Sequence, residues 1–330
     1  MRCCAQFILD RLHRGSWRYL MCMDVLSDAI GVMRTGRPHS ALAERRGRWA
    51  VRHPPFAGAG FHVVLQGTCE LIPEEGAAIA LGVGDTVFLP HGSAHALSDG
   101  ISVPQAGSPV TPLPELDNQV QPDGAVGSTV LLCGAYLFER GRAHPLMDEL
   151  PQLIHLPAHV GRHSSLRAAI DLLGSELEHR RPGMDAVVSA LLDALLTYMV
   201  RSWFAETSDR HAATGWSAAL ADPAIVGALG AMHGDPARQW TVGELAARTG
   251  LSRSAFARRF TALVGRPPLT YLGWWRMTMA AKRLRESDVP LSAVAKQIGY
   301  TSEFAFANAF KREYGIAPGR YRRQGPSAPP

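Results

Sequence analysis

Residues 245–271 read LAARTGLSRSAFARRFTALVGRPPLTY, and residues 294–321 read VAKQIGYTSEFAFANAFKREYGIAPGRY. These two segments carry one motif twice. Gly250 matches Gly299 at an offset of 49, and a one-residue insertion follows in the second copy. Five further pairs then match at an offset of 50: Phe256 with Phe306, Phe260 with Phe310, Gly265 with Gly315, Pro268 with Pro318, and Tyr271 with Tyr321. Each copy places two amphipathic stretches around a glycine, which predicts two helix–turn–helix units.

The local chemistry of each copy supports this prediction. In the first copy Gly250 is expected to make the turn, because glycine adopts left-handed backbone angles without steric cost. Ser252 is placed to cap the next helix. The second copy repeats the pattern with a turn at Gly299 and a cap at Thr301 or Ser302. The inward faces are then Phe256, Phe260 and Leu263 in the first copy and Phe306, Phe310 and Tyr314 in the second.

The segment between the copies, PLTYLGWWRMTMAAKRLRES, predicts one helix beginning at Pro268. A helix of about 19 residues is about 28 Å long. One turn of DNA is about 34 Å, so a rigid connector of this length could place both second helices in successive major grooves.

The charge distribution points to the same partner. The whole chain of 330 residues carries a net charge of +5. Residues 236–323 hold 16 Lys/Arg and 5 Asp/Glu, a net charge of 16 − 5 = +11, which leaves 5 − 11 = −6 for the rest. A basic C-terminal part beside an acidic remainder predicts a polyanion partner for this part only, and with the duplicated helix–turn–helix motif the expected partner is double-stranded DNA.

The segment QIGYTSEFAFANAFKREYGIAPGRYR at 297–322 resembles the signature of the AraC/XylS family of bacterial transcription regulators. The resemblance implies an all-α DNA-binding domain of seven helices over about 219–323. Together with the outward positions of each second helix, it assigns base contacts to Arg253, Ser254, Ala257, Arg258, Glu303, Phe304, Ala305 and Asn308. Phosphate contacts are expected from Ser252, Arg276, Lys282, Arg283, Thr301, Ser302, Lys311 and Arg322.

Two of the base-contact positions depart from family members with larger polar side chains there. Ala257 can touch only a thymine methyl group, and Glu303 could accept from a cytosine amino group but is repelled by phosphate. The first unit carries Arg253, Arg258 and Arg259 on its second helix, so we expect it to supply most of the DNA affinity.

The N-terminal half has a different hydrophobic pattern. From about 48 to 140, short apolar stretches such as FHVVLQG and AIALGVGDTVFLP alternate with Gly, Pro and Asp, which predicts an antiparallel β barrel or sandwich. Residues 99–127 are expected to form a long loop. Helical spacing predicts an antiparallel pair at 163–180 and 184–205, followed by a linker at 206–218. Residues 1–22 are expected to be a non-native or flexible extension before a start at Met23, the alternative being an ordinary N-terminal helix. Residues 324–330 are expected to be a disordered tail.

The segment GDTVFLPHGSAHALSD at 84–99 resembles the second cupin motif. Gly84, Pro90, Gly92 and His95 match it, while Asp99 replaces the final Asn. Of the His-x-His in the first motif only His62 remains. We therefore predict an α+β chain: a cupin-like β barrel with a helical dimerisation pair at 23–205, and an all-α double helix–turn–helix domain at the C-terminus.

His62, His91, His95 and Cys133 could converge in this barrel, as an effector pocket or as ligands of a zinc-like divalent metal. The alternative is that they are ordinary pocket or turn residues. The barrel, MDVLSD and LLCGAYLFE together resemble the cupin-bearing subgroup of AraC-type regulators, which implies a small-molecule effector in the barrel and a homodimer formed through 163–205.

Three classes of function follow. The first is a non-enzymatic transcription regulator controlled by a small molecule, with RNA polymerase as a partner if it activates. The second is a metal-dependent cupin enzyme, a dioxygenase or isomerase, fused to a DNA-binding domain; the lost His-x-His argues against it. The third is an architectural DNA-binding protein with a vestigial barrel.

The cellular compartment follows by elimination. The chain has five cysteines, an odd count that favours reduced thiols. We find no apolar run that reaches the roughly 18 residues that a membrane helix needs. The expected location is the bacterial cytoplasm, on the nucleoid when DNA is bound.

Overall fold

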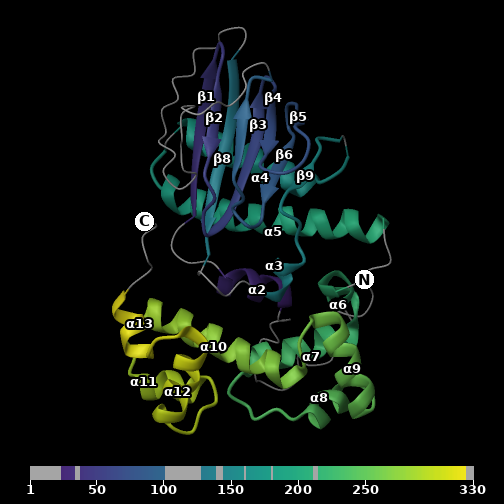
Figure 1. Ribbon diagram of the computed structural model, residues 1–330, viewed down its shortest axis with the longest axis vertical. Coiled ribbons are helices and arrows are strands. Elements are labelled where there is room, and N and C mark those ends of the chain that lie inside the picture. The colour runs from purple at the N-terminus through teal and green to yellow at the C-terminus, as the bar shows by residue number, and fades with distance from the viewer. Residues whose placement is uncertain are drawn as a thin grey trace, which may run out of the picture.

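The computed structural model describes residues 24–33, 38–100, 128–138, 144–159, 161–179, 181–210 and 215–324. It has a β body and a helical body, with the long helix α5 between them (Figure 1). The predicted N-terminal extension, most of the 99–127 loop, the middle of the predicted linker and most of the C-terminal tail lie outside the described residues.

The β body consists of two antiparallel sheets, as the rhythm of 48–140 predicts. The first sheet has the order β1-β8-β3-β6-β9 and the second β2-β7-β4-β5. Their bounds are β1 His39–Arg46, β2 Ala50–His53, β3 Gly58–Gln66, β4 Cys69–Pro73, β5 Ile79–Leu81, β6 Thr86–Leu89, β7 His95–Ser98, β8 Ser128–Leu137 and β9 Ile154–Leu156.

Two of these strands fall outside the predicted range. β1 begins before residue 48 and ends in charged residues, which weakens its apolar signal. β9 has three residues, too few for a period to be read. The space between the sheets is filled by an apolar cluster that includes Val64, Leu71, Leu89, Leu97 and Leu131.

The predicted helix pair is present as α4 (Ser164–His179) and α5 (Met184–Arg210), which pack on one another beside the first sheet. α5 continues to Arg210 and the next helix begins at Gly215, so the predicted linker at 206–218 is too long at both ends. Residues 184–207 of α5 are long and apolar enough to cross a membrane. In this structure its Leu192, Leu195 and Met199 face is buried in the core instead.

The helical body begins with α6 (Gly215–Ala221) and α7 (Pro223–Gly234). It continues with α8 (Val242–Thr249), α9 (Arg253–Val264), α10 (Pro268–Glu286), α11 (Leu291–Gln297), α12 (Glu303–Tyr314) and α13 (Pro318–Gln324). From α7 to α13 these are the seven helices that the family resemblance implies. α10 is the predicted connector at 19 residues. It runs between a lobe of α7, α8 and α9 and a lobe of α11, α12 and α13 (Figure 1).

The two bodies share one apolar core. The short helices α2 (Val25–Met33) and α3 (Pro145–Asp148) lie between them (Figure 1). One cluster of buried side chains runs from Phe61 of β3 through Leu195 of α5 to Phe260 of α9. The relative position of the barrel and the first helix–turn–helix lobe is therefore set by packing.

Candidate DNA-binding surface, domain interface and ligand sites

The first helix–turn–helix unit is formed by α8 and α9. Gly250 lies in the left-handed region at φ 71°, as the turn requires. Ser252 caps α9, with its Oγ accepting from the amide of Ala255 at 3.3 Å. Phe256 and Phe260 are buried, and Val264 rather than Leu263 completes the buried face. The predicted base-contact residues Arg253, Ser254 and Arg258 are exposed, while Ala257 is half-buried.

The second unit has the same construction. Gly299 has φ 86°. Of the two predicted caps, Ser302 is the one used, since its Oγ accepts from the amide of Ala305 at 3.1 Å. Phe304 is 76% exposed, although an apolar side chain of this size is usually covered. The other predicted contact residues of α12, Glu303, Ala305 and Asn308, are exposed as well.

The predicted phosphate contacts fall into two groups. The first is exposed on the helical body: Ser252, Arg283, Thr301, Ser302 and Lys311. The second has partners inside the protein. Arg276 donates to the carbonyls of Pro236 and Arg238 at 2.7 and 2.8 Å, Lys282 to that of Gly31 at 3.0 Å, and Arg322 to that of Val289 at 2.6 Å.

The prediction for this second group rested on charge alone. In the structure Arg276, Lys282 and Arg322 each donate to a backbone carbonyl, and the donors used there are not available to a phosphate. Their phosphate contacts stay a prediction. Arg259 of α9 is likewise paired with Asp222, the cap of α7.

A hydrogen-bonded chain of four side chains crosses the interface between the bodies. The Nε2 atom of His144 lies 3.3 Å from the Tyr271 hydroxyl, which lies 2.8 Å from Nε2 of His233. Nδ1 of His233 lies 3.1 Å from a carboxylate oxygen of Asp28. His144 and Asp28 flank the barrel, whereas His233 and Tyr271 belong to α7 and α10.

The end partners determine the direction of every bond in this chain. The amide of Leu146 donates to Nδ1 of His144, so Nε2 of His144 carries the proton and donates to Tyr271. The Asp28 carboxylate only accepts, so Nδ1 of His233 donates to it. Because the Tyr271 oxygen accepts from His144, the Tyr271 hydroxyl proton is donated to Nε2 of His233. Both imidazoles are thus neutral. Burial lowers the pKa of His144 and of His233, in agreement with this.

In the barrel, three of the four predicted pocket residues converge. Nδ1 of His62 lies 3.0 Å from Sγ of Cys133, and Nε2 of His62 lies 2.8 Å from Nε2 of His95. His91 does not join them: its Nε2 donates to the Leu150 carbonyl at 2.8 Å. His53, which the sequence did not single out, takes that place, with its ring stacked on that of His95 at 4.8 Å between centroids.

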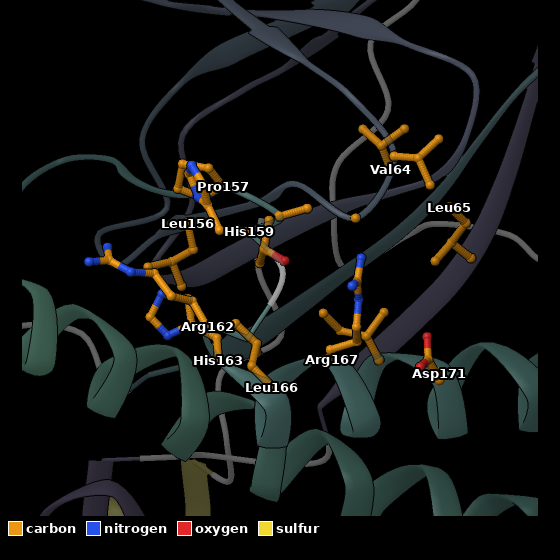
Figure 2. Close-up of a pocket in the computed structure, with 15 residues that line it drawn as sticks. Val64, Leu65, Leu156, Pro157, His159, Arg162, His163, Leu166, Arg167 and Asp171 are labelled. Atoms are coloured by element: carbon orange, nitrogen blue, oxygen red, sulfur yellow. The ribbon is translucent and has the colours of Figure 1, made fainter.

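A cavity of about 110 Å³ lies between the barrel and α4, outside the space between the sheets (Figure 2). Leu65 of β3 and Leu166 and Ile170 of α4 provide apolar walls. Arg162 and Arg167 border it, and the ion pairs of the described residues include neither of them. None of the four predicted pocket residues lines it.

Comparison with known proteins matches both halves of the chain. Residues 24–205 match a cupin family, and residues 245–324 match a helix-turn-helix domain family. A putative AraC-like transcription regulator of Streptomyces lividans is 35% identical over 91% of this chain and 98% of its own length. The HTH-type transcriptional regulator AlkR of Acinetobacter baylyi is 30% identical over 92% of this chain and 100% of its own length.

Two further similarities complete the comparison. The RCS-specific HTH-type transcriptional activator RclR of Escherichia coli is 30% identical over 84% of this chain and 89% of its own length. Among solved structures, the DNA-binding domain of the transcriptional factor AdpA in complex with a target DNA is 35% identical. It covers 31% of this chain and 91% of its own, with a TM-score of 0.29.

Proposed function

The chain belongs to the AraC-like transcription regulators, and we propose that a small molecule bound by its cupin domain controls how it binds DNA. It is a DNA-binding transcription regulator whose double helix–turn–helix body is joined to a cupin body. The observation that carries the proposal is the shared interface. A ligand changes DNA affinity only if it binds the DNA-competent and incompetent arrangements differently. The docked bodies are one arrangement, and their separation at this interface would supply the other.

The polar contacts that join the bodies include the four-residue chain from His144 to Asp28, the bond from Lys282 to Gly31, and the bond from the Trp216 amide to the Glu149 carboxylate. They tie α6, α7 and α10 to elements beside the barrel. Separation of the bodies would release the Lys282 ammonium, which lies on the connector between the two units. We therefore expect the docked form to have the lower DNA affinity.

This expectation is tested in the full chain. Genome-wide mapping of bound sites supplies the cognate DNA, and fluorescence anisotropy then measures affinity for Asp28→Ala beside Asp185→Ala, an exposed acid on α5. Both variants remove one negative charge. Asp28→Ala should bind several-fold more tightly than the control. Equal affinities, or weaker binding by Asp28→Ala, would contradict control through this interface.

The cavity beside α4 is the ligand site that we propose for the effector. Two arginines at the mouth and apolar walls suit a small anion with an apolar part, such as a carboxylate. Asp171 lies on the same helix one turn after Arg167 and adds a negative charge to the rim, so the excess positive charge is modest.

A panel of small carboxylates and their neutral amides tests the effector site. Carboxylates should shift both the melting temperature and the DNA affinity. Arg167→Ala should abolish the response, while Arg201→Ala, an exposed arginine of α5 outside the cavity, should keep it. Anion recognition in the cavity would be excluded if the neutral amides gave the same shifts as the carboxylates. It would also be excluded if the Arg167→Ala protein responded fully.

We also propose that the α4–α5 pair forms a homodimer, as the family resemblance implies. Leu172 of α4 is 57% exposed and Val187 of α5 is 43% exposed, and only 33% of the apolar window of α5 is buried. A second copy would cover this surface. Sedimentation equilibrium should give twice the chain mass for the wild type and a monomer for Leu172→Glu/Val187→Glu; a monomeric wild type would exclude the dimer.

We propose that the protein acts in the bacterial cytoplasm, with RNA polymerase as a partner where it activates transcription.

A further inference from the structure

Inside the barrel, two residue pairs from opposite sheets face one another. His53 and His95 are direct partners in the β2–β7 ladder, and His62 and Cys133 are direct partners in the β3–β8 ladder. All four are buried, with exposed fractions of 5% or less. Cross-strand partners have side chains on the same face of a sheet. The two ladders therefore bring the four side chains together although they are far apart in the sequence.

The proton positions within this group can be deduced. Nδ1 of His95 lies 2.8 Å from the Ser93 carbonyl, which only accepts, so the proton of a neutral His95 is on Nδ1. Nε2 of His95 is then unprotonated and accepts a hydrogen bond from Nε2 of His62 at 2.8 Å. Nδ1 of His62 is consequently a lone pair that accepts from the Cys133 thiol.

We propose that His53, His62 and His95 form a binding site for a divalent metal ion of the zinc class, with Cys133 orienting the His62 ring. One ligand atom from each histidine lies within 4.8 Å of the other two. Nitrogens bound to a tetrahedral zinc at about 2.0–2.1 Å are about 3.3 Å apart, so a separation of 2.8 Å between His62 and His95 needs only a small expansion. Neutral imidazole is a preferred ligand for these metals.

The binding step balances without loss of a proton. The ion replaces the hydrogen between the two Nε2 atoms, and that proton moves to Nδ1 of His62. Nδ1 of His62 then donates to the sulfur of Cys133, whose own hydrogen turns away. His95 keeps its bond to Ser93 throughout. Because Nδ1 and Nε2 are on different edges of the ring, Cys133 supports the ligand and is not itself one.

The character of the site follows from its ligands. Among the described residues the cluster contains three histidines and no carboxylate. Three protein ligands leave the fourth tetrahedral position to water or an exogenous anion, as in open zinc sites. The site is separate from the cavity beside α4, so it does not depend on the effector proposal.

The test uses the full-length chain without a histidine tag, stripped with a chelator and dialysed against zinc. Elemental analysis should find one zinc per chain. His53→Ala and His95→Ala should weaken binding by at least about 100-fold. The matched control is His91→Ala, which removes a histidine from the neighbouring turn that points to Leu150. It should bind as the wild type does.

Cobalt in place of zinc distinguishes the role of Cys133. The spectrum should show tetrahedral nitrogen coordination without a cobalt–thiolate charge-transfer band, and Cys133→Ser should weaken affinity by about 10–100-fold. Should an alanine variant fail to fold by circular dichroism, His53→Gln replaces it. Absence of stoichiometric zinc in the wild type, a thiolate band, or equal losses in His91→Ala and His53→Ala would each overturn the proposal.

Discussion

At the scale of the residue, charge and position divide the arginines of α9 into two kinds. Arg253 and Arg258 are exposed on the side away from the core, whereas Arg259 is paired with the cap of α7. An arginine free at the N-terminal part of a recognition helix can bind a guanine edge with two donors, and one held by a carboxylate cannot do so without breaking that pair. The expectation that the first unit supplies most of the affinity thus rests on Arg253 and Arg258.

Arg258→Ala should weaken binding to the cognate site by about 1–3 kcal/mol if Arg258 contacts a base. Fluorescence anisotropy on cognate and random DNA at one salt concentration measures the effect. Arg312→Ala, an exposed arginine of α12 away from its N-terminus, is a charge-matched control. An equal loss on random DNA would assign Arg258 to phosphate.

Two buried histidines of the interface make the stability of the folded protein depend on pH. Burial lowers the pKa of His144 and His233, and their neighbours are Asp28, Tyr271, Arg266 and the Trp275 ring. In the unfolded chain these histidines take up a proton near pH 6.5, whereas in the folded protein their buried imidazoles stay neutral to lower pH. Stability is therefore complete above about pH 6.5 and falls as the pH drops below it, by up to ~1.4 kcal/mol per histidine and pH unit.

Urea unfolding between about pH 7.5 and pH 5.5 measures this loss. His233→Gln removes one titrating group and should give a smaller slope of unfolding free energy against pH than the wild type. Buried histidines of the barrel contribute to both curves and cancel in the difference. Identical slopes would show that His233 takes up its proton normally in the folded protein.

At the scale of the element, the two turns look equivalent in sequence and differ in space. Both Gly250 and Gly299 have positive φ. A Cβ atom at Gly250 would meet nothing within 4 Å, while one at Gly299 would lie 2.5 Å from the Ala237 carbonyl oxygen. The Gly299 carbonyl also accepts from the Gln239 side chain at 2.7 Å. The second turn is therefore packed against the segment between α7 and α8, and the first turn is open.

Gly250→Ala should cost about 1–2 kcal/mol, the strain of a left-handed alanine. Gly299→Ala adds a clash with backbone and should cost clearly more. Thermal or urea unfolding of the two variants side by side provides the comparison, and each serves as the control of the other. Equal losses would show that the contact with Ala237 relaxes freely.

At the scale of the whole molecule, the two bodies form one packed unit. The same core cluster that holds α4 on the barrel reaches Phe260 of the first helix–turn–helix lobe, while the second lobe has its own cluster around Phe306 and Phe310. The first lobe is thus fixed to the barrel, and the second is attached to the first through α10 and through the contact of the Gly299 turn with Ala237 and Gln239. Domain docking therefore bears directly on the unit that carries the exposed arginines.

The positions of Arg283 and Arg276 predict different effects of the two residues on the salt dependence of DNA affinity. Affinity for DNA should fall linearly with the logarithm of the salt concentration, because bound phosphates release counterions. Arg283→Ala, at an exposed position of α10, should reduce that slope by about one ion. Arg276→Ala should leave it unchanged, since Arg276 is bonded to the carbonyls of Pro236 and Arg238. Equal changes in both slopes would contradict the division of the phosphate contacts.

What the sequence determined by itself is local. The caps, the positive-φ glycines, the buried Phe spacing of each unit and the 19-residue connector follow from interactions within a few residues of the chain, so a repeated pattern was sufficient to predict them. The α4–α5 pair was predicted on the same basis. Such features depend on backbone angles and on periodicity, which are properties of neighbours.

Only the tertiary structure decided which polar groups meet. His53 joined His62 and His95 while His91 did not, because the register of two ladders selects partners and one turn of chain aims His91 elsewhere. The chain from His144 through Tyr271 and His233 to Asp28 joins residues as far as 205 positions apart. Lys282 and Arg276 bond to carbonyls of distant segments. Long-range contacts depend on how whole elements pack, and no local spacing encodes them.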